Sequence, residues 1–146
     1  MTTTPNPELQ PFDAFVGEWT IEAKHRLLPG VVVRGDTVFE WLAGEKFLIQ
    51  RSTMEHPDFP DGIAIIGMFG DGLAMHSFDS RGVYRVLEAS FDDGVWRLWR
   101  DASPPDFSQR FAGSFADGGD TIQGVFQIAH ADGRWEDDME ITYRRR

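Results

Sequence analysis

Four side chains in this sequence carry a group that can take part in chemistry and lie within otherwise apolar segments. His25, His76 and Asp137 are residue types that act as general acids or bases when their surroundings tune the pKa. Arg51 carries a permanent charge on a planar fork that matches a carboxylate or another anionic group. We interpret these four as the polar contents of a protein interior, where a buried polar group needs a partner or a ligand.

Three uses of this polar set remain open. The side chains could bond to one another as a structural network, or Arg51 could orient the anionic head of a ligand. Alternatively, a cofactor-free cyclase, isomerase or lyase could use His25, His76 or Asp137 as its catalytic acid or base. Of these functions we favour binding of a small, largely apolar and possibly carboxylate-bearing molecule. The predicted ligand-binding residues are Trp41, Arg51, His76, Phe111 and Tyr143.

No cofactor and no metal site is predicted. Cysteine is absent, which removes thiolate ligands, and no His-Glu-x-x-His motif or twelve-residue calcium loop occurs. Haem binding is a lesser alternative, because haem iron needs an axial ligand that His76 or His130 could supply.

The inward orientation of the candidates rests on the period of two along β-strands. If Trp19 points inward, His25 does too, and Arg51 shares a face with Phe47 and Ile49. Asp137 falls on the apolar face of the last strand. In the stretch 73–79 two faces compete, and the face with His76 is taken as the inner one.

Five Asp-Gly pairs indicate the strands that carry these residues. The pairs are at 61–62, 71–72, 93–94, 117–118 and 132–133, and Asp-Gly suits the tight turns of β-hairpins. The intervening alternation predicts ten strands over 18–26, 32–42, 46–55, 62–69, 73–79, 83–91, 94–100, 108–116, 120–130 and 134–144. Since an open sheet of this size would expose two edges, we expect an all-β, closed, antiparallel up-and-down barrel.

The two ends of the barrel should differ. Leu9, Phe12 and Phe15 recur every three residues, which predicts a short helical turn that covers one end. The proline-containing gaps 55–61 and 101–107 are the loops expected to border an opening.

Length and composition limit the classes of protein. The 146 residues predict a single domain over 1–146 with a flexible segment over 1–8. The net charge of −10 disfavours nucleic acid as a partner, and no apolar run is long enough for a membrane helix. With no signal peptide and no cysteine, the sequence predicts a cytoplasmic protein that acts without a membrane partner, as a monomer or homodimer.

Phe15-Val16-Gly17-Glu18-Trp19 resembles the Gly-x-Trp opening of calycin barrels, which include lipocalins, fatty-acid-binding proteins and nitrobindin. The resemblance implies that Trp19 closes one barrel end beneath a basic side chain of the last strand, for which Arg144 is the candidate.

A closer likeness spans nearly the whole chain. The segments 17–19, 39–42, 78–83, 109–111 and 135–138 are similar to those of small lipocalin-like bacterial proteins, mostly actinobacterial. The resemblance implies the fold and supplies no activity, cofactor or catalytic residue. Thr20 to Ala23 departs from the glycine-rich continuation of nitrobindin, which weakens any transfer of haem binding.

Overall fold

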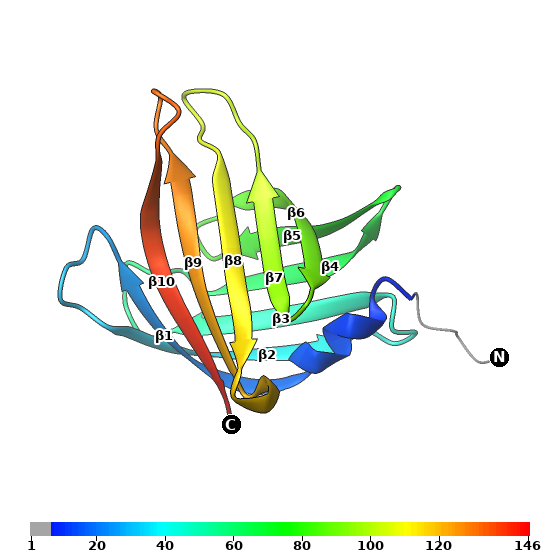
Figure 1. Cartoon of the computed structure of the whole chain (residues 1–146). Helices are drawn as coiled ribbons and strands as arrows, with labels where there is room; N and C mark the ends of the chain where they lie inside the picture. Colours follow the sequence, from blue (N-terminus) through cyan, green and yellow to red (C-terminus); the bar gives the residue numbers. More distant parts are fainter. Residues whose placement is uncertain (1–6) are drawn as a thin grey trace.

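The chain forms one closed antiparallel barrel in which each strand pairs with its neighbours in sequence and β1 pairs with β10 (Figure 1). The computed structural model describes residues 7–146. The strands are β1 (Gly17–His25), β2 (Val33–Trp41), β3 (Phe47–Met54), β4 (Gly62–Phe69), β5 (Gly72–Asp79), β6 (Tyr84–Asp92), β7 (Val95–Arg100), β8 (Gln109–Ala116), β9 (Thr121–Ala129) and β10 (Trp135–Arg145). The predicted all-β barrel of ten strands is confirmed.

One predicted Asp-Gly pair forms a tight turn at one end of the barrel, whereas Gly62 and Gly72 of two other pairs are the first residues of β4 and β5. Between β6 and β7 the turn consists of Asp93 and Gly94, whose φ angles are 53° and 73°. Two positive φ values in a two-residue loop match the twist of the flanking strands, and glycine adopts such values without a steric penalty.

An aromatic plug closes that end of the barrel. The 3-10 helix η1 (Gln10–Phe15) lies across it, and Leu9, Phe12 and Phe15 are buried, as predicted. The Phe15 ring lies 4.9–5.2 Å from the rings of Phe12, Phe39, Phe91, Trp96 and Phe115. This end is therefore solid, and any space for a ligand lies toward the other end.

Trp19 lies under the plug and is fully buried. Its indole nitrogen donates a hydrogen bond of 2.8 Å to the Phe15 carbonyl. The guanidinium above its ring, at 4.1 Å, belongs to Arg145 and not to Arg144, so that prediction is wrong. Arg145 is the register partner of Trp19 and shares the inward face with Tyr143, whereas Arg144 points outward and pairs with Glu22.

The described helices are η1 and the three-residue 3-10 turn η2 (Asp117–Gly119). Within residues 7–146 neither could cross a membrane, because both are far too short. The predicted flexibility of residues 1–8 concerns a segment of which residues 1–6 lie outside the described part.

Candidate functional site

A cavity of about 250 Å³ occupies the open half of the barrel. Its wall is mostly apolar and includes Ile21, Ala23, Met75 and Ile141. Phe59 and Pro60, in the loop between β3 and β4, border it as predicted for residues 55–61. At 30 Å³ per molecule of liquid water, the volume equals that of about eight waters.

Tyr143 and Gln50 form a buried polar pair in the cavity wall. They are 5 % and 8 % exposed, and the Gln50 side chain hydrogen-bonds the Tyr143 hydroxyl. Burial raises the pKa of Tyr143 to about 12 and outweighs the hydrogen bond from Gln50, which lowers it. Because the Trp96 ring lies 6.2 Å away, Tyr143 separates the cavity from the aromatic plug.

The buried phenol predicts a loss of stability at alkaline pH. An unfolded chain ionises tyrosine near pH 10, whereas folded Tyr143 keeps its proton up to about pH 12. Between these values the unfolded state binds fewer protons, so the free energy of unfolding should fall by roughly 2–3 kcal/mol. Urea unfolding at pH 9 to 12 should show this fall in the wild type and not in Tyr143→Phe; the same pH dependence in both would contradict it.

Arg85 lies near the start of β6, at the open end of the barrel. It is the register partner of Ser77, which lines the cavity, and it follows the inward alternation of Leu87, Ala89 and Phe91 along β6. Its guanidinium lies 5.4 Å from the Phe107 ring and forms no ion pair within 4 Å in residues 7–146. Burial, followed by the nearby positive charge of Arg100, lowers the Arg85 pKa. Arg85 is thus a half-buried cation without a carboxylate partner.

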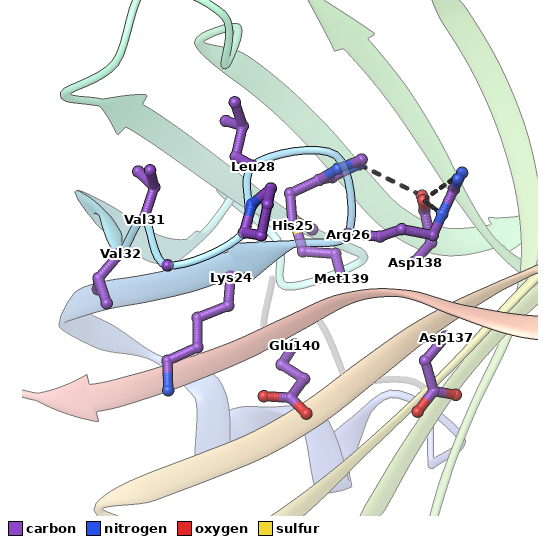
Figure 2. Close-up of a pocket in the computed structure, with 12 residues that line it drawn as sticks. Lys24, His25, Arg26, Leu28, Val31, Val32, Asp137, Asp138, Met139 and Glu140 are labelled. Atoms are coloured by element: carbon purple, nitrogen blue, oxygen red, sulfur yellow. Dashed lines mark hydrogen bonds and ion pairs between the residues drawn. The ribbon is translucent and has the colours of Figure 1, made fainter.

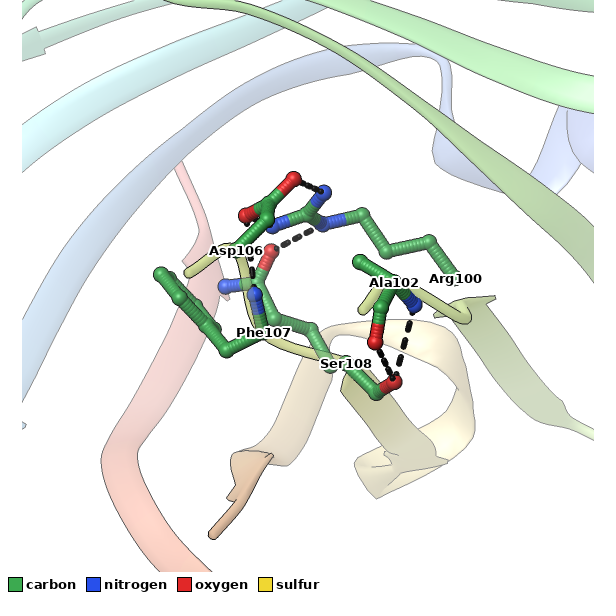
Figure 3. Close-up of polar contacts among 6 residues, drawn as sticks. Arg100, Ala102, Asp106, Phe107 and Ser108 are labelled. Atoms are coloured by element: carbon green, nitrogen blue, oxygen red, sulfur yellow. Dashed lines mark hydrogen bonds and ion pairs between the residues drawn. The ribbon is translucent and has the colours of Figure 1, made fainter. Parts of the chain in front are cut away.

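Arg100, on the neighbouring strand β7, has a carboxylate partner for its positive charge, in contrast to Arg85. Figure 3 shows its guanidinium facing the Asp106 carboxylate, to which it donates two hydrogen bonds of 2.9 and 3.0 Å. A third bond, of 2.8 Å, goes to the Gln109 side chain. Hydrogen bonds from Arg100 and from the Phe107 backbone lower the pKa of Asp106 to about 2. The loop 101–108 is thereby held over the mouth, with Phe107 between both arginines.

Asp79 also contacts the cavity, and its carboxylate is fully engaged in a turn. It accepts hydrogen bonds from the backbone amides of Arg81 and Val83 and from the Arg81 side chain. The Arg81 side chain, with the two backbone amides, lowers the Asp79 pKa. The carboxylate is therefore held by the turn, and it acts on Arg85 only through space, as does Asp106, without forming an ion pair with it.

The predicted interior positions of Arg51 and His76 are wrong. Arg51 lies on the outer face, 52 % exposed, where it pairs with Glu40. His76 also faces outward, with its ring stacked on Phe69 and its Nδ1 2.8 Å from the Tyr84 hydroxyl. In both strands the opposite face lines the barrel, through Gln50 and Ser52 in β3 and through Met75 and Ser77 in β5.

Asp137 also fails to reach the interior, because a β-bulge shifts the register of β10 between Asp137 and Met139. The alternation that sequence reasoning carried through the strand is broken there. Asp137 is exposed and accepts a 2.7 Å hydrogen bond from Gln127 on the outer surface.

The remaining predicted residues occupy three different places. Tyr143 lines the cavity. Phe111 is buried inside the barrel, with its ring edge-on to Trp96 and tilted against Phe126, and belongs to the packed core. Trp41 lies at the closed end, where its indole donates to Asp13 of η1.

His25 stands at the rim of the open end, on the inward-facing side of β1 as predicted. Its ring packs edge-on against Phe59 at 5.9 Å, and its Nε2 is 3.5 Å from Asp138. The three catalytic candidates therefore do not converge, since His76 and Asp137 are on the outer surface.

The residues present do not fit a haem of the nitrobindin type. Neither candidate ligand reaches the interior, because His76 faces outward and His130 lies just after β9, beside Glu136. The described lining of the cavity contains no histidine, and its volume is far below that of a haem. Within residues 7–146 no group of three His, Asp or Glu side chains is arranged to hold a metal ion.

A larger hollow of about 510 Å³ lies outside the barrel, between the loop 26–32 and β10 (Figure 2). Some of its polar side chains pair with one another: Arg26 binds Asp138, and His25 lies beside the same carboxylate. The inner cavity differs from this hollow in lying inside the barrel, with Arg85 on the neighbouring strand.

Sequence reasoning missed Arg85, although a signal was present. Arg85 shares the phase of Leu87, Ala89 and Phe91, and the last of these packs against the core. A cation in phase with a buried apolar row is the pattern that we assigned to Arg51 instead.

Comparison with known proteins identifies the fold alone. No family model matches the chain, and no curated protein sequence matches it. Among solved structures, the crystal structure of Rv2717c from M. tuberculosis is similar over 98 % of this chain and 99 % of that chain, with a TM-score of 0.68 and 15 % sequence identity.

Proposed function

We propose that the barrel binds a small, largely apolar molecule that carries one anionic group. The apolar part would occupy the cavity of about 250 Å³, and the anionic group would meet Arg85 at the mouth. The observation that carries this proposal is the half-buried Arg85 guanidinium without an ion-pair partner in residues 7–146, next to a cavity wall.

The cavity favours a short ligand. Its lining is apolar apart from a few hydrogen-bonding groups such as Ser52, Ser77, Gln50 and Tyr143, the last two of which hydrogen-bond each other. Ligand pockets of this composition usually measure 300 Å³ or more, so a volume of about 250 Å³ suits an aromatic or short aliphatic acid better than a long-chain fatty acid.

The charges at the mouth favour an anion over a neutral molecule. Arg100 is balanced by Asp106, and Asp79 by Arg81, which leaves the Arg85 charge in excess. A partly desolvated cation loses hydration, and an anionic ligand would restore that loss by hydrogen bonding. We therefore propose Arg85, in place of Arg51, as the residue that orients the anionic group of the ligand.

A titration with two probes of the same shape tests the proposal. Benzoate and benzamide differ in charge, and amide NMR shifts of the wild type, of Arg85→Met and of the matched control Arg51→Met report binding. Because a hydrogen bond to a charged group contributes about 1.5–3 kcal/mol, the wild type should prefer benzoate by roughly 10- to 100-fold. Arg85→Met should remain folded and lose this preference, whereas Arg51→Met should keep it.

Two results would count against the proposal. A benzoate preference that survives in Arg85→Met would show that another group binds the anion. If neither probe shifts the amides of Ser77 and Ile141, which line the cavity, the interior is not the ligand site.

A further inference from the structure

Five aromatic rings form a continuous row on the outside of the barrel, across β3 to β6. Successive ring centroids are 5.4 Å apart for Phe47 and Phe69, 3.8 Å for Phe69 and His76, 5.8 Å for His76 and Tyr84, and 4.9 Å for Tyr84 and Phe78. These strands lie side by side in the sheet. The row is therefore a single surface feature and not a set of isolated side chains.

Aliphatic side chains extend this row into a patch. The register places Ile63 beside Phe78 and Tyr84, and Ile65 beside His76 and Val86. Ile63, Phe78, Tyr84 and Val86 are 43 %, 45 %, 53 % and 43 % exposed. We call this surface the outer apolar face. It is formed by Phe47, Ile49, Ile63, Ile65, Phe69, His76, Phe78, Tyr84 and Val86. Contiguous exposed apolar surface of this kind marks an interaction site.

Two opposite charges stand at opposite corners of the outer apolar face. Arg51 on β3 is in the row of Ile63, Phe78 and Tyr84. Glu88 on β6 lies four residues beyond Tyr84, in the row of Ala74 and Gly67. Glu88 forms no ion pair within 4 Å in residues 7–146, whereas Arg51 binds Glu40 and keeps half of its side chain in solvent.

We propose that the outer apolar face binds a second copy of this chain in a twofold-symmetric dimer. In such an interface the same patch of each copy contacts the other. A residue i of one copy then contacts a residue j of the other, and j contacts i, so the two must be complementary. A twofold axis along the diagonal from Phe47 to Tyr84 exchanges the other two corners. It brings Arg51 of each copy to Glu88 of the other, which forms two ion pairs around an apolar centre.

The charge distribution supports a second copy as the occupant. The protein carries a net charge of −10, so two copies repel each other over most of their surfaces. The outer apolar face holds no acidic side chain at its centre. At its corners, the positive charge of Arg51 is complementary to the negative charge of Glu88. An interface with an apolar core and a charged rim is the arrangement that stable complexes use.

Sedimentation velocity from about 1 to about 200 μM tests the proposal. The wild type should change from monomer to dimer within this range. Val86→Lys, which places a charge in the apolar centre, should raise the dimer Kd at least about tenfold. Ser114→Lys is the matched control, because Ser114 is exposed on the outer face of β8, away from the patch, and its Kd should equal that of the wild type.

Charge reversal tests the twofold arrangement itself. Glu88→Arg alone should raise the dimer Kd about tenfold by placing like charges at each corner, and Arg51→Glu with Glu88→Arg should restore it to within about threefold. Thermal melting of each variant checks that it folds. A wild type that stays monomeric, a Val86→Lys variant that dimerises normally, or a double variant that is not rescued would each overturn the proposal. Binding of a monomeric wild type to phosphatidylcholine vesicles would assign the face to a membrane instead and would also overturn it.

Discussion

Trp19→Ala should lower the free energy of unfolding by roughly 3–5 kcal/mol, the range for deletion of a large buried aromatic side chain. Trp19 is fully buried beneath η1 and donates its indole hydrogen bond to Phe15. Its removal would leave a cavity at the closed end and would take away the ring under Arg145, which lies 4.1 Å above it. Urea unfolding followed by circular dichroism measures the loss.

Two companion variants show which part of Trp19 matters. Trp19→Phe keeps most of the apolar volume and loses the hydrogen bond, so its effect should lie between those of the wild type and Trp19→Ala. Trp99→Ala removes a half-buried indole from the outer face and should cost about 1 kcal/mol. If Trp19→Ala unfolds at the same urea concentration as the wild type, Trp19 does not close the barrel.

Phe15→Ala should have a similar effect, again roughly 3–5 kcal/mol. Phe15 is fully buried, and five aromatic rings contact it at 4.9–5.2 Å. Its loss would weaken the packing of η1 on the barrel, because Leu9 and Phe12 would be the remaining buried side chains of residues 9–15. We therefore also expect faster amide hydrogen exchange at Trp19 and along η1.

Phe15→Leu and Leu27→Ala are the controls for this effect. Phe15→Leu preserves an apolar contact and should cost less than Phe15→Ala, whereas Leu27 is 66 % exposed and its truncation should change stability by less than about 0.5 kcal/mol. Equal stability of Phe15→Ala and Leu27→Ala would contradict the plug as the element that closes this end.

The outer apolar face explains why the sequence pattern wrongly places Arg51 and His76 in the interior. A period of two reveals which residues share a face, and it identifies the inner face only when the outer one is polar. In β3 and β5 the outer face is apolar as well, through Phe47 and Ile49 and through Phe78. Arg51 and His76 share that apolar outer face and were therefore read as interior.

Asp137 and Arg144 illustrate a different limit. Alternation predicts orientation only while a strand stays in register, and the bulge between Asp137 and Met139 shifts the register of β10 in a way that its apolar pattern does not reveal. At the end of the same strand, the register partner of Trp19 is Arg145, so the choice between adjacent arginines depended on the pairing of two strands distant in sequence.

The ten strands, their antiparallel closure and the plugged end were predictable, because turn chemistry, strand alternation and the spacing of Leu9, Phe12 and Phe15 are local properties of the chain. The polar side chains that meet were not predictable, because they come from different strands. Arg85, Arg100 and Phe107 converge at the mouth because register and barrel curvature bring β6, β7 and the loop 101–108 together there. Such convergence depends on contacts between strands, which no periodicity within one strand encodes.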